Sequence, residues 1–156
     1  MNRFELIRRT LFALLLATTV TACEPAPDFH TDVHGATAWQ NYEGQYVVVN
    51  YFAEWCAPCL RELPELNEFH HQYGDQVTLL GVSFDQLDNA ALQALRQKYE
   101  IEFPLIQTSP APQLPFPRPA ALPATYIVTP TGEVTGPLLG EQTIASLKAA
   151  TGLSAD

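Results

Sequence analysis

Two stretches of the chain consist almost entirely of apolar residues. The first runs from Tyr46 to Ala53 and the second from Val77 to Phe84. Both are rich in β-branched and aromatic residues, and the first lacks polar alternation, which is typical of a strand covered on both faces in an α/β sheet. Asn50 is the one polar interruption of the first run. The pattern therefore predicts two buried central strands.

The rest of the sequence predicts shorter elements around these strands. Helical spacing of apolar residues predicts helices over residues 60–73, 89–99 and 144–150. Pro64 lies inside the first helix and is expected to kink it, and Asp88 or Asn89 is expected to cap the second. Strand patterns predict a short edge strand at 37–39, a strand at 103–106 and a hairpin of 125–128 with 133–139.

Residues 108–123 form a proline-rich segment, with prolines at positions 110, 112, 115, 117, 119 and 123. Proline lacks the backbone N–H group and fixes φ. The segment is therefore expected to form neither a helix nor a ladder strand.

The first residues have the composition of an export signal and not of a folded element. Basic residues precede an apolar run over residues 11–17, and small residues follow up to Cys23. The run is too short to span a bilayer comfortably. The segment Val20 to Cys23 resembles the lipobox of bacterial lipoproteins, which implies cleavage before Cys23 and acylation of that residue. Ordinary secretory cleavage, which would leave a free thiol at the terminus, is the alternative.

We therefore divide the chain into a lipoprotein signal peptide (1–22), a flexible tether (23–36) and one domain (37–156). The tether prediction rests on prolines and a glycine without hydrophobic periodicity. His30 and His34 lie in this stretch at a spacing that would suit a metal ion on a helix. Stray histidines are common in tethers, and we predict no metal site.

The charge of the chain limits the class of partner. The formal net charge is −9, and removal of residues 1–22, with three basic residues and one acid, makes it −11. So acidic a protein is not expected to bind nucleic acid or an anionic lipid surface by charge.

The sequence Trp55 to Cys59 carries the candidate chemistry, because Cys56 and Cys59 follow the first buried strand where a helix is expected to begin. Free N–H groups and the helix dipole favour a thiolate at such a place. A disulfide across so short a loop stabilises little, about 2 kcal/mol, which suits reversible opening. A zinc site and an inert buried pair are the alternatives. Zinc needs about four ligands, and Cys23 is the only other cysteine.

These motifs resemble the thioredoxin fold, and within it the TlpA/ResA-like extracytoplasmic thiol–disulfide oxidoreductases. The resemblance covers residues 37–152 and is most specific at Val49 to Cys59. Pro64 matches the helix-kinking proline of that family, and 122–128 resembles the segment with the family's cis-proline, here Pro123. The resemblance implies an α/β fold of three layers, α/β/α, with a central mixed sheet.

The family resemblance also assigns roles to single residues. Cys56 is expected to attack a substrate disulfide and Cys59 to resolve the mixed disulfide. Leu122, next to a cis Pro123, is expected to pair with the substrate backbone, and Trp55 is expected to form the floor of the groove. This exchange needs no organic cofactor and no metal.

The chain differs from cytosolic thioredoxins at two polar positions, Asn50 and Glu62. Asn50 replaces their aspartate, and an amide cannot relay protons, so it is expected only to hydrogen-bond beneath the site. Glu62 matches a glutamate of the tethered branch, where it could take the proton of Cys59 and raise the pKa of the thiols. Alternatively, Glu62 is a solvated acid in the first helical turn. His70 and His71 are expected at the surface.

The predicted function is a reductant of disulfides in exported proteins, held by an acylated Cys23 on the periplasmic face of a bacterial membrane, with the inner membrane favoured. Family likeness suggests apocytochrome c as a substrate and a membrane-bound thiol-reducing protein as electron donor. An oxidant of the same fold, a copper-delivery protein and a non-catalytic binding lipoprotein remain alternatives. The proline-rich segment is either a stiff lip that selects partners through Phe116 and Arg118 or a surface spacer.

Overall fold

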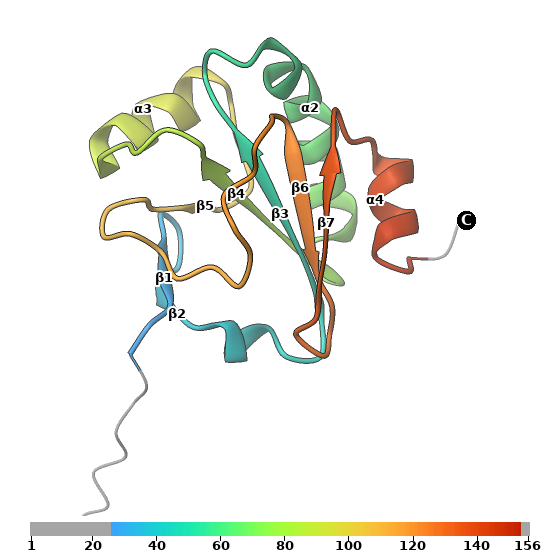
Figure 1. Cartoon of the computed structure of the whole chain (residues 1–156). Helices are drawn as coiled ribbons and strands as arrows, with labels where there is room; N and C mark the ends of the chain where they lie inside the picture. The colour runs from blue at the N-terminus through green and yellow to red at the C-terminus, as the bar shows by residue number, and fades with distance from the viewer. Residues whose placement is uncertain (1–25, 154–156) are drawn as a thin grey trace, which may run out of the picture.

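The computed structural model describes residues 26–153, which form one mixed sheet with helices packed against it (Figure 1). The strands are β1 (Phe29–Thr31), β2 (Gly35–Thr37), β3 (Tyr46–Phe52), β4 (Val77–Ser83), β5 (Leu105–Ile106), β6 (Ala124–Val128) and β7 (Val134–Leu139). The helices are the 3-10 helix η1 (Trp39–Tyr42) and the α-helices α2 (Ala57–Tyr73), α3 (Asn89–Lys98) and α4 (Ile144–Ala150). In the seven-stranded sheet the order is β2-β1-β5-β4-β3-β6-β7.

The central strands are parallel and the outer ones antiparallel. β4 pairs in parallel with β3 and with β5, whereas β6 runs antiparallel to both β3 and β7. Helix α2 connects β3 to β4, and α3 connects β4 to β5, which lies on the far side of β4 from β3. Both connections therefore cross the sheet in the same direction. Since such crossovers are right-handed, both helices lie on one face of the sheet, where α4 joins them (Figure 1).

The predicted α/β fold with a central mixed sheet is confirmed, but the two outer layers differ in kind. One core cluster joins the sheet to α2, α3 and α4, with Leu66, Leu92 and Leu147 among its buried side chains. The cluster on the opposite face contains no residue of these three helices. In the described part of the chain that face is covered by η1 and the proline-rich segment, whose buried Phe116 stacks on Tyr126 at a centroid distance of 4.3 Å.

The start of the domain corrects the predicted tether. β1 and β2 form a hairpin within it, and Thr31 of β1 pairs with Ile106 of β5. Asp32, in the hairpin turn, accepts hydrogen bonds from Arg96 Nε at 2.6 Å and from the Leu105 backbone N at 2.8 Å. The tether prediction is therefore wrong from Phe29 onward, and the edge strand expected at 37–39 ends at Thr37.

The cap of α3 and the positions of His30 and His34 can be compared with the sequence-based predictions. Asp88 caps α3 by accepting from the Ala91 N–H group, as predicted. His30 lies in β1 and His34 in the turn after it, so their spacing is not that of a helix. Cys23 and the predicted signal peptide lie outside the described residues. Within residues 26–153, no helix is both long enough and apolar enough to cross a membrane.

Candidate active site

The two cysteines lie where β3 gives way to α2. Cys56 is the N-cap residue of α2, and its sulfur accepts a hydrogen bond from the Cys59 N–H group at 3.3 Å. Pro58 stands in the first turn of the helix, where its missing N–H has no partner to lose. Cys56 and Cys59 are joined by a disulfide, with their Cα atoms 5.3 Å apart. The predicted redox pair is thus formed at the start of a helix.

The two sulfur-bearing residues differ in access to solvent. Cys56 is 5% exposed, whereas Cys59 is 0% exposed. Cys56 borders a groove of about 530 Å³, and the other lining residues are Trp55, Ala57, Pro58, Phe84, Ala120, Ala121 and Leu122. An incoming disulfide can therefore reach the sulfur of Cys56, while Cys59 is positioned to attack Cys56 from inside.

The proline-rich segment ends beside the redox pair. The peptide bond between Leu122 and Pro123 is cis, as the resemblance implied. Pro123 is buried, and Leu122 lines the groove together with Cys56. The backbone enters β6 directly afterwards, where Ala124 pairs with Tyr51 of β3. The segment that the sequence assigned to substrate pairing is therefore adjacent to the attacking sulfur.

Trp55 is more exposed than a groove floor would be. Its side chain is 64% exposed, and its indole Nε1 donates to Asp85 Oδ2 at 2.9 Å. The indole also meets the Phe84 ring edge to face, at a centroid distance of 6.0 Å. Trp55 is thus held over the groove by the loop after β4. The roles of Asp85 and Phe84 at the site could not be predicted from the sequence, because they depend on a contact between segments 30 positions apart.

Glu62 is buried one helical turn after Cys59, so the solvated-acid interpretation is wrong. The residue is 1% exposed. Its carboxylate accepts from Asn50 Nδ2 at 2.8 Å and from the Gln142 backbone N at 2.8 Å. Burial raises the pKa of Glu62 to about 7, although both hydrogen bonds act in the opposite direction. The carboxyl group can therefore gain or lose a proton near neutral pH.

Asn50 connects this carboxyl group to the sheet. Its Nδ2 also donates to Thr125 Oγ1 at 3.1 Å, across the β3–β6 pair. Asn50 is fully buried, and within the described chain its Oδ1 atom has no hydrogen-bond partner. The amide therefore holds Glu62 in place, as expected of a group that cannot relay protons.

The adjacent histidines lie at the far end of α2. His71 is exposed and pairs with Glu102, as expected of a surface residue. His70 is half-buried, less exposed than His71, and its pKa is lowered by burial and by the neighbouring His71. Among residues 26–153, no group of three or more histidine, cysteine, aspartate or glutamate residues could hold a metal ion.

Most of the proline-rich segment is exposed at the surface, but the buried Phe116 anchors it in the core. Phe116 packs on Tyr126 and lies edge to face with Tyr51. Arg118 points the other way, and its guanidinium lies over the Phe84 ring at 3.5 Å from the centroid. Phe116 and Arg118 thus have separate positions, one in the core and one near the groove.

A model of the AhpC/TSA family matches residues 23–136. The chain belongs to this family. Thiol-disulfide oxidoreductase ResA of Geobacillus kaustophilus is 30% identical over 129 residues, which cover 81% of this chain and 74% of the relative. ResA of Bacillus anthracis is 28% identical over 126 residues, which cover 79% of this chain and 72% of the relative.

Solved structures agree on the fold. The crystal structure of StoA from Bacillus subtilis superposes with a TM-score of 0.64 at 22% identity, covering 80% of this chain and 98% of StoA. The family, the relatives and the Cys56–Cys59 pair together make this protein a thiol–disulfide oxidoreductase of the ResA type.

Proposed function

We propose that this protein is a membrane-tethered reductant of disulfide bonds in exported proteins. The Cys56 thiolate attacks one sulfur of the substrate disulfide, forms a mixed disulfide and releases the other substrate sulfur as a thiolate, which takes up a proton. Cys59 then loses its proton to Glu62 and attacks the Cys56 sulfur. This step restores the Cys56–Cys59 disulfide and releases the second substrate thiolate. Two electrons pass from the protein to the substrate, and a donor dithiol returns them.

The buried Glu62 is the observation that supports a reductant. An ionised carboxylate near the two sulfurs disfavours their thiolate forms and raises their pKa. A strong oxidant instead gains its potential from a stabilised reduced form. Asp85 accepts a hydrogen bond from the Trp55 indole and adds a further acid beside the site, whereas Glu54 is paired with Lys98. The electrostatics therefore favour transfer of electrons to the substrate.

Export and tethering rest on the sequence of the first residues. The basic and apolar leader over residues 1–22 and the lipobox-like segment ending at Cys23 support an acylated protein on the periplasmic face of a bacterial inner membrane. A reductant in that oxidising compartment needs a membrane-bound thiol-reducing donor, and a tether keeps the protein near it. Apocytochrome c is the substrate that the family likeness favours.

A redox titration of the Cys56–Cys59 pair tests the direction of transfer. The purified protein is equilibrated in glutathione buffers and the thiols are counted by alkylation. We expect a potential more negative than about −220 mV, in the range of reducing thiol proteins. A potential near about −120 mV, as for strong oxidants, would show that the protein oxidises its substrates.

Covalent capture tests the substrates and the location. In cells that express Cys59→Ser, the mixed disulfide on Cys56 cannot be resolved, so exported proteins should accumulate as adducts in the membrane fraction. Cys56→Ser with Cys59→Ser is the matched control and should capture nothing. Adducts formed only with cytosolic proteins would contradict this proposal. So would recovery of this protein, with Cys23 unchanged, only in the soluble fraction.

A further inference from the structure

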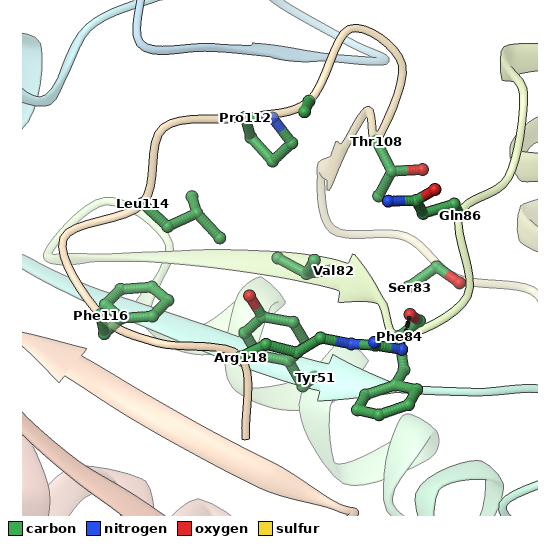
Figure 2. Close-up of a pocket in the computed structure, with 11 residues that line it drawn as sticks. Tyr51, Val82, Ser83, Phe84, Gln86, Thr108, Pro112, Leu114, Phe116 and Arg118 are labelled. Carbon is green, nitrogen blue, oxygen red and sulfur yellow. Dashed lines mark hydrogen bonds between the residues drawn. The ribbon is translucent and has the colours of Figure 1, made fainter. Parts of the chain in front are cut away.

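A second cavity lies under the proline-rich segment, at the ends of β3 and β4 (Figure 2). Its volume is about 270 Å³. Most of its wall is apolar, from Val82, Ala111, Pro112, Leu114 and Phe116. The cavity is separate from the core of the helical face, and the exchange chemistry described above does not use it.

Tyr51 brings an unpaired polar atom to this cavity. The residue is 5% exposed, and none of its interactions in the described structure is a hydrogen bond. Figure 2 shows its hydroxyl group directed toward the space between Val82 and Leu114. Burial raises the pKa of Tyr51 to about 12, so the hydroxyl stays protonated at neutral pH and can both donate and accept. The hydroxyl has no protein partner among the described residues and opens onto the cavity, so a ligand there could replace solvent as its hydrogen-bond partner.

Arg118 lies at the cavity beside the groove of the redox pair. Its Nη2 donates to the Phe84 backbone carbonyl at 2.8 Å, and its guanidinium covers the Phe84 ring (Figure 2). The cavity lining contains no aspartate or glutamate, so most of the guanidinium donors face neutral surroundings. A flat cation above an aromatic ring, with further aromatic walls, is a surface on which another aromatic ring packs well.

The cavity lies next to the groove beside Cys56. Phe84 lines both of them, and the chain from Arg118 to Leu122 runs from the cavity to the groove. A substrate strand that pairs with the backbone at Leu122 therefore continues along this chain toward Arg118. With about 3.3 Å per residue, a side chain two to four positions from the attacked cysteine reaches the cavity.

We propose that this cavity is a specificity pocket for an aromatic side chain of the substrate polypeptide, with tyrosine as the best occupant. This inference rests on the proposed function, namely that the substrate is a polypeptide disulfide. The aromatic ring of the substrate fills the apolar space against Phe116 and Arg118. The phenol oxygen of a substrate tyrosine pairs with the Tyr51 hydroxyl.

Synthetic disulfide peptides test the pocket. One series carries a single tyrosine, phenylalanine or serine at each position from two to four residues on either side of the attacked cysteine, and kcat/KM is measured for each peptide. We expect one position at which tyrosine exceeds serine about tenfold, which corresponds to about 1.4 kcal/mol. Phenylalanine should fall between them.

Two variants and one control assign the preference to the pocket. Ala111→Trp places a bulky ring at an exposed position of the cavity lining and should abolish the aromatic preference while leaving the serine peptide unchanged. Tyr51→Phe should remove the difference between tyrosine and phenylalanine peptides but keep their advantage over serine. Ala149→Trp, at an exposed position of α4, should change nothing.

The outcomes separate this inference from the proposed function. If all peptides are reduced but no position prefers an aromatic residue, the pocket is refuted and the reductase function stands. The pocket is equally refuted if the preference survives Ala111→Trp. If no peptide is reduced by the wild-type protein, both the function on polypeptides and the pocket are refuted.

Discussion

Glu62 is the group whose environment differs most from that of an ordinary surface acid, and the substitution Glu62→Gln tests its burial. The new side-chain amide keeps an oxygen to accept from the Gln142 N–H group. Its amide nitrogen would face Asn50 Nδ2, but Asn50 can rotate its own amide and offer Oδ1, which is buried and has no partner in the described structure. The change therefore removes the ionisation and keeps the packing.

The magnitude follows from the pKa of Glu62, which rises from 4.5 in the unfolded reference to about 7 in the folded protein. Between these pH values the folded protein keeps a proton that the unfolded chain has lost, so stability falls as the pH rises. Each pH unit in this interval is worth about 1.4 kcal/mol. The folded wild type therefore loses about 3 kcal/mol between pH 4.5 and pH 7, relative to a variant that does not ionise.

Urea unfolding of the oxidised proteins from pH 4 to pH 9 measures this difference. In the oxidised form the disulfide-bonded cysteines do not titrate. The contributions of all other groups cancel when the unfolding free energy of the wild type is subtracted from that of the variant. We expect the difference in unfolding free energy, Glu62→Gln minus wild type, to increase from pH 4.5 to about pH 7. Above about pH 7 this difference should stay constant. A difference that does not depend on pH, or one in which the wild type gains as the pH rises, would refute the argument.

Three further predictions concern the fold and the site. Asp32→Ala should destabilise the protein by about 3–5 kcal/mol in urea unfolding, because it leaves the half-buried Arg96 without its carboxylate partner; a surface change such as Glu68→Ala should cost little. Gly81→Ala should cost about 1–3 kcal/mol, since a Cβ atom would lie 2.6 Å from a Leu105 side-chain atom and 2.8 Å from Phe103, and an unchanged stability would contradict this packing. The pH profile of disulfide reduction should show an inflection near 7 in the wild type that is lost in Glu62→Gln, and a profile shared by both proteins would exclude Glu62 as the proton acceptor.

Long apolar runs and the redox motif could be predicted from the sequence. The run from Tyr46 contains β3, and the run from Val77 contains β4, each to within a residue. Both strands are buried on two faces, so nearly every position had to be apolar. The position of Cys56 at the start of α2 followed from the end of β3 and the tolerated Pro58.

Short elements and long-range contacts could not be predicted in the same way. β1 and β2 have three residues each, too few to show an alternating pattern. The prolines shortly before β1 favoured the interpretation of a tether. Their attachment depends on Asp32 and Arg96, which lie 64 positions apart in the sequence. The burial of Glu62 likewise depends on the backbone N–H group of Gln142, 80 positions away, so helical spacing alone could not decide between a buried and a solvated acid.

Reduction of insulin disulfides, with dithiothreitol as electron source, tests the central claim most directly, because it requires the Cys56–Cys59 pair to cycle. The account predicts that the wild type accelerates the precipitation of the insulin chains severalfold over dithiothreitol alone, and that Cys56→Ser returns the rate to the uncatalysed value. Equal rates for the wild type and Cys56→Ser would contradict the assignment of this sulfur as the nucleophile of the exchange.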